Sequence, residues 1–336
     1  MKDVKEKKYL GDIISNDGKN QKNITDRTNK AIGNINRIEL TLRERHYGRH
    51  YFKAFRLMRE GLLLGGLLNN VESWINVNQK DLEALEKPDV ILMRKVLSSS
   101  GNPCKTFMML ELGILPVKFV IMKKRLQFLH YILNENTTSM IRQVFSALEK
   151  DSRKGDFISL TNEDKINLDI ELHNTEIQTM SKWKWKSYIK KRVKSAALKS
   201  LVYENSSMKK TRNINFSSLD MSEYLRENVK LSLTKIVFSL RSKTIDIKEY
   251  QPWKYSDNKC VKCKKEKETM HNFATCEEYG VEKENRWTDI NENNTVRQIE
   301  IAKVIEKRLK LRKLVIKKQE DGQASSNSGS SCSSSQ

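Results

Sequence analysis

The chain has 336 residues, a length that suggests about two domains of roughly 100–200 residues each. Apolar residues make up 38% and charged residues 31%, so the chain is more polar than a typical globular protein at about 45–50% apolar. With 13 Gly and 4 Pro it is unlike a β-sandwich or collagen, and no apolar run approaches the ~18–20 residues of a membrane span. No apolar signal region follows the N-terminal residues. We therefore expect an intracellular protein of the nucleus or cytoplasm, not secreted and without a membrane partner.

The charge balance is strongly basic. Sixty-three Lys and Arg against 42 Asp and Glu give a net charge of +21 and a pI near 9.6. Such a balance favours a polyanionic partner, most simply nucleic acid. The alternative is a lysine-rich proteome, which would raise the pI of every protein in it.

Residues 1–19 predict a short β-hairpin. Tyr9, Ile13 and Ile14 are β-formers, and Asn16-Asp17-Gly18 is a turn signal. After residue 20 the apolar positions step by four and three, which is the period of an amphipathic helix. These positions are Ile24, Thr28, Ala31, Ile35, Ile38 and Leu42.

Helical patterns continue to about residue 244, punctuated by prolines and glycines. Pro88 is expected to kink or end a helix over residues 79–97, and Pro116 is placed to begin a helix that runs to about Leu133. Glycines interrupt the apolar face of residues 50–78, which indicates either close helix packing or a break. These glycines are Gly61, Gly65 and Gly66. The absence of βαβ alternation predicts a mainly α fold rather than an α/β enzyme.

The sharpest local signal is the spacing C-x2-C-x7-H-x4-C, formed by Cys260, Cys263, His271 and Cys276. Two cysteines on a tight turn, with a His and a Cys five residues apart, supply the four ligands of a closed tetrahedral zinc site. A closed shell leaves no position for a catalytic water, so we expect a structural zinc without a hydrolytic role. Surrounding lysines would lower the thiol pKa values and attract phosphate. The alternative is chance spacing among five Cys and five His.

Basic and aromatic residues are interleaved after residue 181. From Lys182 to Arg212 there are eleven basic residues and one acid, Glu204. This mixture suits contact with phosphates combined with base stacking. The alternative is an amphipathic helix whose tryptophans partly enter the core. Residues two apart cannot share a helix face, so one tryptophan is expected in the core and the other as a stacking platform. The candidate nucleic-acid-binding residues are Lys182, Trp183, Lys184, Trp185, Lys186, Tyr188, Lys190, Lys191 and Arg192.

A second basic segment, residues 291–320, is predicted as a helix. Nine Lys and Arg lie between Arg297 and Lys318, against two acids. This helix suits a nucleic acid, a partner or a membrane surface, and a plain solvated helix is an equal alternative. Residues 321–336 are rich in Ser, Gly and Asn, so they are expected to be disordered. The apolar stripe of the helix is Ile301, Val304, Ile305, Leu309, Leu311 and Leu314.

Several catalytic motifs are missing from the sequence. It has no Gly-rich phosphate loop and no Gly-x-Ser-x-Gly elbow. Two-metal nucleotidyl transfer needs clustered carboxylates, and no Asp-Asp dipeptide occurs. The histidines without a motif partner, which we expect to be structural, are His46, His50, His130 and His173.

Several stretches together carry a family resemblance. They are Lys8–Gly18, Tyr51-Phe52, Leu57–Glu60, Asn70–Trp74, Leu110–Pro116, Lys124–Leu133 and the cysteine motif. In this order they resemble the thumb, connection and C-terminal zinc knuckle of reverse transcriptases from non-LTR (LINE-like) retrotransposons. The resemblance covers about residues 7–290. It implies a helical thumb and connection bundle, with a short N-terminal β-hairpin and a small zinc knuckle.

The resemblance also implies a domain order and a partner. The family's catalytic palm would precede this segment, so the chain alone is not expected to polymerise. We expect a nucleic-acid-binding C-terminal fragment of an RNA-directed DNA polymerase that binds RNA or an RNA/DNA duplex and works with a palm-bearing chain. The alternative is a non-catalytic protein-interaction module with a structural zinc. The expected segments are 1–19 hairpin after the palm, 20–135 thumb-like domain, 136–248 connection, 249–290 zinc knuckle, 291–320 basic helix and 321–336 tail.

Overall fold

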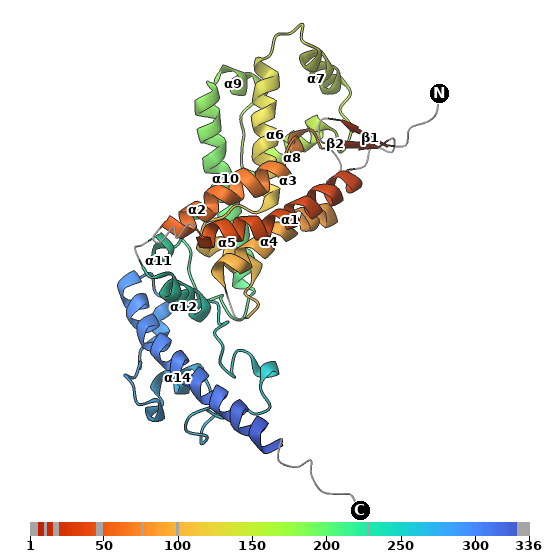
Figure 1. Ribbon diagram of the computed structural model, residues 1–336. Helices are drawn as coiled ribbons and strands as arrows, with labels where there is room; N and C mark the ends of the chain where they lie inside the picture. Colours follow the sequence, from red (N-terminus) through yellow and green to blue (C-terminus); the bar gives the residue numbers. More distant parts are fainter. Residues whose placement is uncertain are drawn as a thin grey trace, which may run out of the picture. The chain divides into compact units, whose positions relative to one another are not determined.

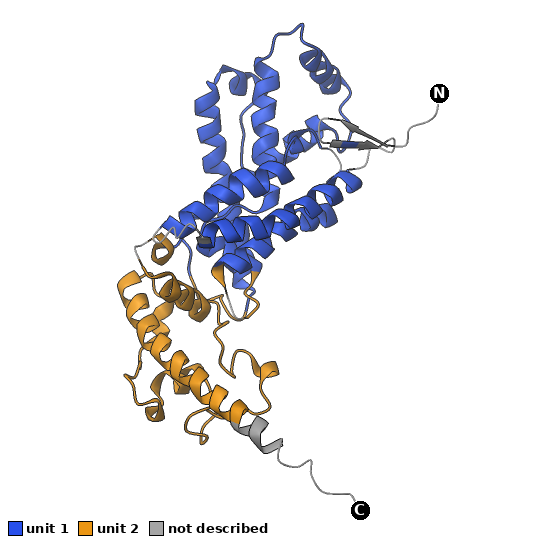
Figure 2. Ribbon diagram, in the orientation of Figure 1, with its two compact units in different colours: residues 1–96, 105–208, 215–222 blue, residues 97–104, 209–214, 223–336 orange. Residues whose placement is uncertain are grey.

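The computed structural model is mainly helical, as expected (Figure 1). It divides the chain into two compact units (Figure 2). Unit 1 comprises residues 1–96, 105–208 and 215–222, and unit 2 comprises residues 97–104, 209–214 and 223–336. These two units do not correspond to the six segments expected from the sequence, whose boundaries stay a prediction. The structure describes residues 6–9, 12–15, 20–44, 50–74, 77–98, 101–226 and 229–327.

The helices of unit 1 make up most of its mass. They are α1 (Gln21–Glu44), α2 (Tyr51–Met58), η2 (Arg59–Leu64), α3 (Gly65–Leu67), η3 (Val71–Ser73), α4 (Gln79–Leu97), α5 (Lys105–Leu112), α6 (Val117–Asn134), α7 (Met140–Lys150), α8 (Phe157–Asn167), α9 (Asn174–Thr179) and α10 (Lys182–Ser206). Those of unit 2 are α11 (Glu223–Arg226), α12 (Leu231–Arg241), η4 (Pro252–Lys254), α13 (Met270–Thr275), η5 (Glu277–Tyr279), η6 (Trp287–Asn291) and α14 (Thr295–Asn327). In the described part of the chain every helix is too short or too polar to cross a bilayer.

Two short strands precede α1. β1 (Glu6–Tyr9) and β2 (Asp12–Ser15) pair antiparallel, with Glu6 opposite Ser15 and Tyr9 opposite Asp12. Residues 10–11 and 16–19, which include the turn signal at Asn16-Asp17-Gly18, lie outside the described residues. The N-terminal hairpin therefore stays a prediction.

The apolar stripe predicted for α1 is buried. Each apolar position of the stripe is at most 5% exposed, and Thr28, which completes it, is 7% exposed. Their alternating spacing of four and three residues places them on one side of the helix, where burial removes apolar surface from water. The buried apolar residues are Ile24, Ala31, Ile35, Ile38 and Leu42.

The glycine-rich stretch after α2 neither packs closely nor breaks. The chain stays helical from Tyr51 to Leu67, with a π-helical turn at η2. A Cβ added at Gly61 or Gly66 would meet no heavy atom within 4 Å. Both interpretations of these glycines are therefore wrong. A π-turn accommodates one residue more than an α-turn, so the helix changes its facing direction without ending.

Pro88 lies inside α4 and does not end it. A proline removes the hydrogen bond to the carbonyl oxygen four residues earlier, here that of Ala84. The hydroxyl of Thr28 on α1 lies 3.5 Å from this oxygen and donates to it. A hydroxyl group from a neighbouring helix thus donates to the carbonyl oxygen that loses its backbone donor to proline.

Pro116 precedes α6 as its N-cap residue, and the helix runs from Val117 to Asn134. The prediction for this helix was off by one residue at each end.

Near the C-terminus of the chain, α14 extends to Asn327, so residues 321–327 are helical rather than part of a disordered tail. Gln and Ala, present at 323 and 324, are good helix formers. Residues 328–336 lie outside the described residues.

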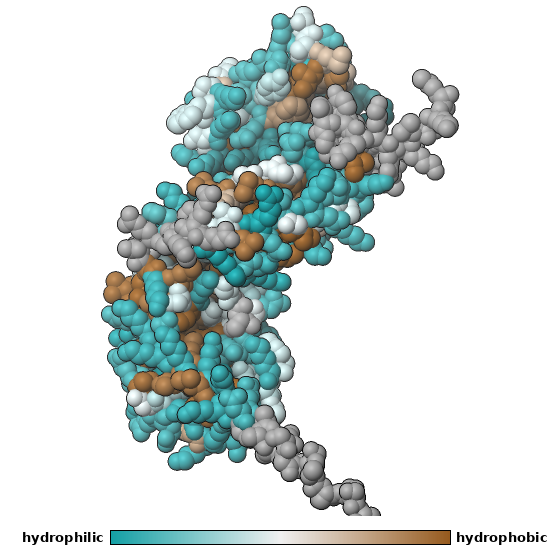
Figure 3. All heavy atoms as spheres, in the orientation of Figure 1, coloured by the Kyte–Doolittle hydropathy of each residue, from teal (hydrophilic) through white to brown (hydrophobic). Residues whose placement is uncertain are grey.

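Arginines are used inside the fold and lysines outside it. Among the described residues six arginines are buried, whereas Lys248 is the one buried lysine. Hydrophilic side chains cover most of the face shown in Figure 3. A guanidinium has five donors in a fixed fork and can satisfy several buried acceptors at once, which an ammonium does less well. The buried arginines are Arg27, Arg59, Arg125, Arg241, Arg308 and Arg312.

Candidate metal centre and nucleic-acid interface

The cysteine segment of unit 2 folds as a tight loop closed by an antiparallel bridge between Lys259 and Lys267. Inside the bridge, the N–H of Cys260 donates to the carbonyl of Glu266 at 2.7 Å. The N–H of Lys264 donates back to the carbonyl of Cys260 at 3.1 Å. Lys264 has φ of 58°, a left-handed conformation that few non-glycine residues adopt. The loop reverses at this point, directly after Cys263.

α13 brings the third cysteine back to this loop. The N-cap residue of this helix is Thr269, whose hydroxyl accepts from the N–H of Asn272 at 3.1 Å. Its inward face is apolar, because Met270 and Phe273 are both at most 1% exposed. Cys276 follows directly as the C-cap residue.

The three cysteines form a cluster suited to a soft cation. The sulfur atoms of Cys260, Cys263 and Cys276 all lie within 4.8 Å of one another, and those of Cys260 and Cys276 are 4.0 Å apart. Tetrahedral zinc with Zn–S bonds of about 2.3 Å needs sulfurs about 3.8 Å apart. Thiolates select zinc and related soft metals over calcium or magnesium. These three residues can therefore hold a metal ion such as zinc.

His271 is not part of this cluster. It lies on α13 between buried residues, but its own side chain is exposed. The helix phase that turns Met270 and Phe273 inward turns His271 outward. Three of the four predicted ligands are thus brought together, and the fourth is not.

The environment of the cysteines works against free thiolates. Burial raises the pKa of the Cys260 thiol to about 12, and burial also raises the pKa of Cys276. The pKa of Cys263 is lowered, first by a hydrogen bond from the backbone of Glu266. A metal ion that takes these sulfurs as ligands must release their protons, and its positive charge offsets their burial.

Arg308 of α14 is the principal contact between that helix and the cysteine segment. It is fully buried, and its guanidinium donates to four backbone carbonyls. Nη1 donates to Phe273 at 3.0 Å and to Cys276 at 3.1 Å. Nη2 donates to Val281 at 3.1 Å, while Nε and Nη2 both donate to Glu282, at 3.0 and 2.9 Å. One side chain therefore fixes the backbone on both sides of Cys276.

Arg312 makes the second contact, one turn further along α14. It forms a bidentate ion pair with Glu268, with Nε–Oε1 of 3.1 Å and Nη2–Oε2 of 2.9 Å. Glu268 also accepts from the N–H of Lys248 at 2.9 Å and, more weakly, from the N–H of Val261 at 3.4 Å. The carboxylate thus joins α14 to the residue directly after Cys260.

Sequence reasoning missed the role of these two arginines. The signal was present, because Ile301, Ile305, Arg308 and Arg312 step by four, three and four along one helix face. Ile301 and Ile305 are fully buried, so the arginines continue the buried stripe. Of the stripe predicted from apolar residues alone, Leu314 is instead 57% exposed. Over residues 301–312 α14 is a packed helix, not a solvated one.

The basic aromatic segment forms the first half of α10. Its N-cap is Ser181, whose hydroxyl accepts from the N–H of Lys184 at 3.3 Å. Trp185 is 1% exposed and its indole N–H donates to the carbonyl of Leu126 on α6 at 2.9 Å. Trp183 is 80% exposed. The expected division between a core tryptophan and an exposed one is confirmed.

The remaining candidate residues divide by helix face. The side chains of Tyr188 and Arg192 are half-buried, with the Arg192 guanidinium 5.4 Å from the centre of the Tyr188 ring. Tyr188 also stacks on Trp185, with ring centres 5.8 Å apart. The exposed lysines are Lys182, Lys184, Lys186, Lys190 and Lys191. The outer face of this half of α10 is therefore basic, with one exposed indole.

Comparison with protein-family models, with curated proteins and with solved structures finds no significant match to this chain. The resemblance to non-LTR reverse transcriptases stays a prediction.

Proposed function

We propose that the chain binds RNA or an RNA/DNA duplex through the outer face of α10. The observation that carries this proposal is the exposure of Trp183 among five solvent-facing lysines on one helix. Lysines neutralise phosphates, and an exposed indole offers a flat surface on which a base can stack. An aromatic side chain of this size at 80% exposure has no packing role of its own in the folded chain.

The metal centre has a structural role in this proposal. Zinc would be held by Cys260, Cys263 and Cys276, and His271 would be the fourth ligand if its exposed side chain turned toward the sulfurs. The site braces the loop against Arg308 and Arg312. With all four positions filled, such a site would leave none for a catalytic water.

We propose that the chain by itself does not polymerise nucleotides. The sequence has no Asp-Asp dipeptide. A polymerase needs such carboxylates to hold two metal ions. We propose that the chain is a nucleic-acid-binding part of a non-LTR retrotransposon reverse transcriptase and that a palm-bearing chain would supply catalysis.

The test is a salt titration of binding to a labelled single-stranded RNA and to an RNA/DNA duplex, followed by fluorescence anisotropy. The variant replaces Lys182, Lys184 and Lys191 with Ala. Its affinity should fall, and the slope of log K against log salt should become shallower by about 2–3, since each phosphate contact contributes about 0.7–0.9. Unchanged affinity and slope would exclude α10 as the interface.

A matched control removes the same charge elsewhere in unit 1. Lys53, Lys80 and Lys87 are exposed, and none of their side chains makes a hydrogen bond or an ion pair with the described residues. Replacing these three with Ala changes the net charge equally and should lower the slope much less. Equal losses in the two triple variants would mean that only total charge matters.

The second candidate function is a protein-interaction module. The observation that favours it is the exposure of two leucines on α2 and η2, Leu57 at 65% and Leu62 at 60%. A contiguous patch of exposed apolar side chains is typical of a contact surface, whereas single exposed ones are ordinary. A chain that binds neither nucleic acid at low salt would favour this alternative.

A further inference from the structure

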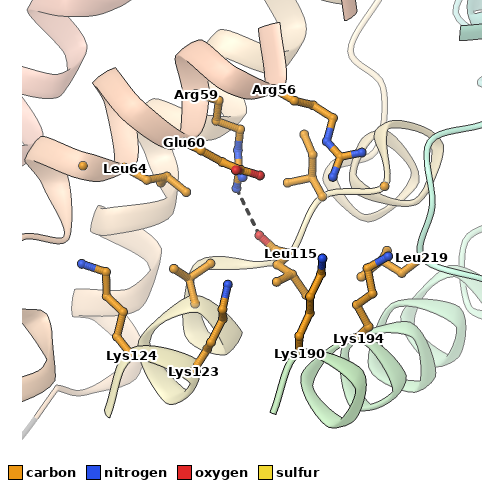
Figure 4. Close-up of a pocket in the computed structure, with 14 residues that line it drawn as sticks. Arg56, Arg59, Glu60, Leu64, Leu115, Lys123, Lys124, Lys190, Lys194 and Leu219 are labelled. Carbon is orange, nitrogen blue, oxygen red and sulfur yellow. Dashed lines mark hydrogen bonds between the residues drawn. The ribbon is translucent and has the colours of Figure 1, made fainter. Parts of the chain in front are cut away.

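A basic cavity of about 530 Å³ lies within unit 1, and it shares Lys190 with the outer face of α10. Side chains from α2 and η2, from α6 and from α10 line it (Figure 4). Apolar wall residues include Leu64, Ile114 and Val120. The cationic residues lining it are Arg56, Arg59, Lys123, Lys124, Lys190 and Lys194. Glu60 is the single acidic residue of the lining.

Three of these six cations are already engaged by the protein. Arg59 forms a buried bidentate pair with Asp89, with Nε–Oδ1 of 2.7 Å and Nη2–Oδ2 of 2.5 Å. The ammonium of Lys124 donates to the carbonyl of Leu68 at 2.6 Å. Lys194 pairs with Asp220 at 2.7 Å. These interactions fix the walls of the cavity and neutralise two of the three charges.

The other three cations are Arg56, Lys123 and Lys190. In the described part of the chain none of these three side chains makes a hydrogen bond or an ion pair. In Figure 4 their charged ends point into the same space from α2, α6 and α10. Against three positive charges the lining offers one carboxylate, and Glu60 is itself exposed to solvent. The cavity therefore has an excess of positive charge.

The excess of positive charge acts on the ammonium group of Lys123. Its pKa is lowered, first by burial and then by repulsion from Lys190, Lys186 and Lys124, while Glu60 acts in the opposite direction. Gathering like charges in a partly buried space is unfavourable unless an anion offsets it. An anion with several acceptor oxygens would meet donors from three sides at once.

The geometry points to a binding pocket for the phosphate group of a nucleotide, with Arg56, Lys123 and Lys190 as its direct ligands. The volume is larger than a bare phosphate requires and falls in the range of pockets for small organic ligands, about 300–1,000 Å³. The apolar wall leaves room for the sugar and base. The phosphate belongs either to the end of a nucleic-acid strand or to a free mononucleotide. The first of these two assignments rests on the proposed function.

The experiment measures binding of five probes to the zinc-loaded full chain. They are inorganic phosphate, adenosine, adenosine monophosphate, and one oligonucleotide of about ten residues with and without a terminal phosphate. The terminally phosphorylated oligonucleotide should bind about tenfold more tightly than its hydroxyl form, since it adds a charge-assisted contact to several cations. Adenosine monophosphate should bind and adenosine should not.

The test variant carries Lys123→Gln and Lys190→Gln, and its control carries Lys53→Gln and Lys87→Gln. The test variant should lose the preference for the terminal phosphate, whereas the control should keep it. Removing two mutually repelling charges should not unfold the chain. Arg56→Gln, at a half-buried side chain, gives a second variant that should weaken the preference without a change in melting temperature.

The outcomes separate the two proposals. If wild type binds both oligonucleotides equally and ignores adenosine monophosphate, or if the test variant keeps the preference, the pocket assignment is wrong while the α10 interface can stand. If adenosine monophosphate binds in a Lys123- and Lys190-dependent way but no strand binds, the pocket takes a free nucleotide and the proposed function fails. Binding of inorganic phosphate alone would overturn the nucleotide assignment.

Discussion

The guanidinium of Arg308 lies 3.1 Å from the carbonyl oxygen of Cys276 and donates a hydrogen bond to it. A helix remote in sequence therefore holds the third cysteine by its backbone. Because Arg308 also reaches Phe273, Val281 and Glu282, the position of the sulfur depends on the docking of α14. Metal binding and helix docking should be coupled.

Replacing Arg308 with Leu should destabilise the chain by more than about 3 kcal/mol, because each buried carbonyl left without a donor costs about 1–3 kcal/mol. Arg308→Lys should recover only part of this loss, since an ammonium cannot span four carbonyls. Urea unfolding followed by circular dichroism measures the effect. The neighbouring exposed residue provides the control, and Lys307→Ala should change stability by less than about 0.5 kcal/mol. A neutral Arg308→Leu would show that α14 does not hold the cysteine segment.

The purified chain should carry one zinc ion. Cys263→Ser should lower its metal content and abolish the thiolate-to-cobalt absorption, while Cys104→Ser, outside the cluster, should leave both unchanged. His271→Ala should weaken cobalt binding if the imidazole turns inward, and an unchanged spectrum would leave three thiolates and a water. Since protons compete for Cys260, whose pKa is raised to about 12, metal affinity should rise with pH over the range 5–8. Native mass spectrometry and cobalt titration provide the measurements.

The two tryptophans of α10 should behave oppositely on substitution. Trp185→Ala should cost about 3–5 kcal/mol, because it empties a core position and removes a donor to Leu126. Trp183→Ala should leave stability within about 0.5 kcal/mol but lower nucleic-acid affinity by about 1–3 kcal/mol, the contribution of one stacked base. Thermal unfolding and RNA binding, measured on both variants, separate the two roles. An RNA affinity that Trp183→Ala does not alter would remove the stacking role.

Stability should depend on pH through Asp164, a buried residue paired with Arg125 at 2.8 Å. Burial raises the pKa of this carboxyl to about 6, above its ordinary value of 3.8. The folded chain then holds this proton more tightly than the unfolded chain. The contribution of Asp164 to the free energy of unfolding therefore falls as pH rises from about 4 to about 6. The decrease should be at most about 3 kcal/mol, from about 1.4 kcal/mol per pKa unit. Asp164→Asn should lack this part of the pH dependence, and identical pH slopes for the two proteins would exclude it.

Two glycines should respond in opposite directions to alanine. Gly113 has φ of 62°, and an added Cβ would collide with the backbone of Asp220 and Met221. Gly113→Ala should destabilise by more than about 1–2 kcal/mol, the cost of the left-handed conformation alone. Gly33 lies inside α1 with open space around it, so Gly33→Ala should stabilise by about 0.5–1 kcal/mol. The melting temperature should be lower than that of wild type for Gly113→Ala and higher for Gly33→Ala. An unchanged melting temperature for Gly113→Ala would contradict the prediction.

Features set by local periodicity were predictable. The spacing of residues along one helix predicts the buried stripe of α1 and the helix after Pro116. It also predicts that one of Trp183 and Trp185 is buried and the other exposed. The helix through Pro88 was not predictable in this way. Its tolerance depends on the hydroxyl of Thr28, which is 56 residues away along the chain.

The metal site shows the same limit. The spacing of Cys260 and Cys263 predicts their proximity, because one tight turn decides it. The outward direction of His271 depends on the phase of α13 against the rest of unit 2, which spacing does not reveal. The cavity cations Arg56, Lys123 and Lys190 come from three separate helices, so no stretch of sequence displays them together.

The unequal use of the two basic residue types has a chemical consequence. The guanidiniums of Arg59, Arg125, Arg308 and Arg312 are buried in the architecture, whereas the charge available to solvent is carried mainly by primary amines. Acyl groups transfer to amines and not to guanidiniums, and acetylation removes the charge of a lysine. The chain can therefore lose much of its surface charge through covalent modification while the ion pairs and carbonyl contacts of these buried arginines stay intact.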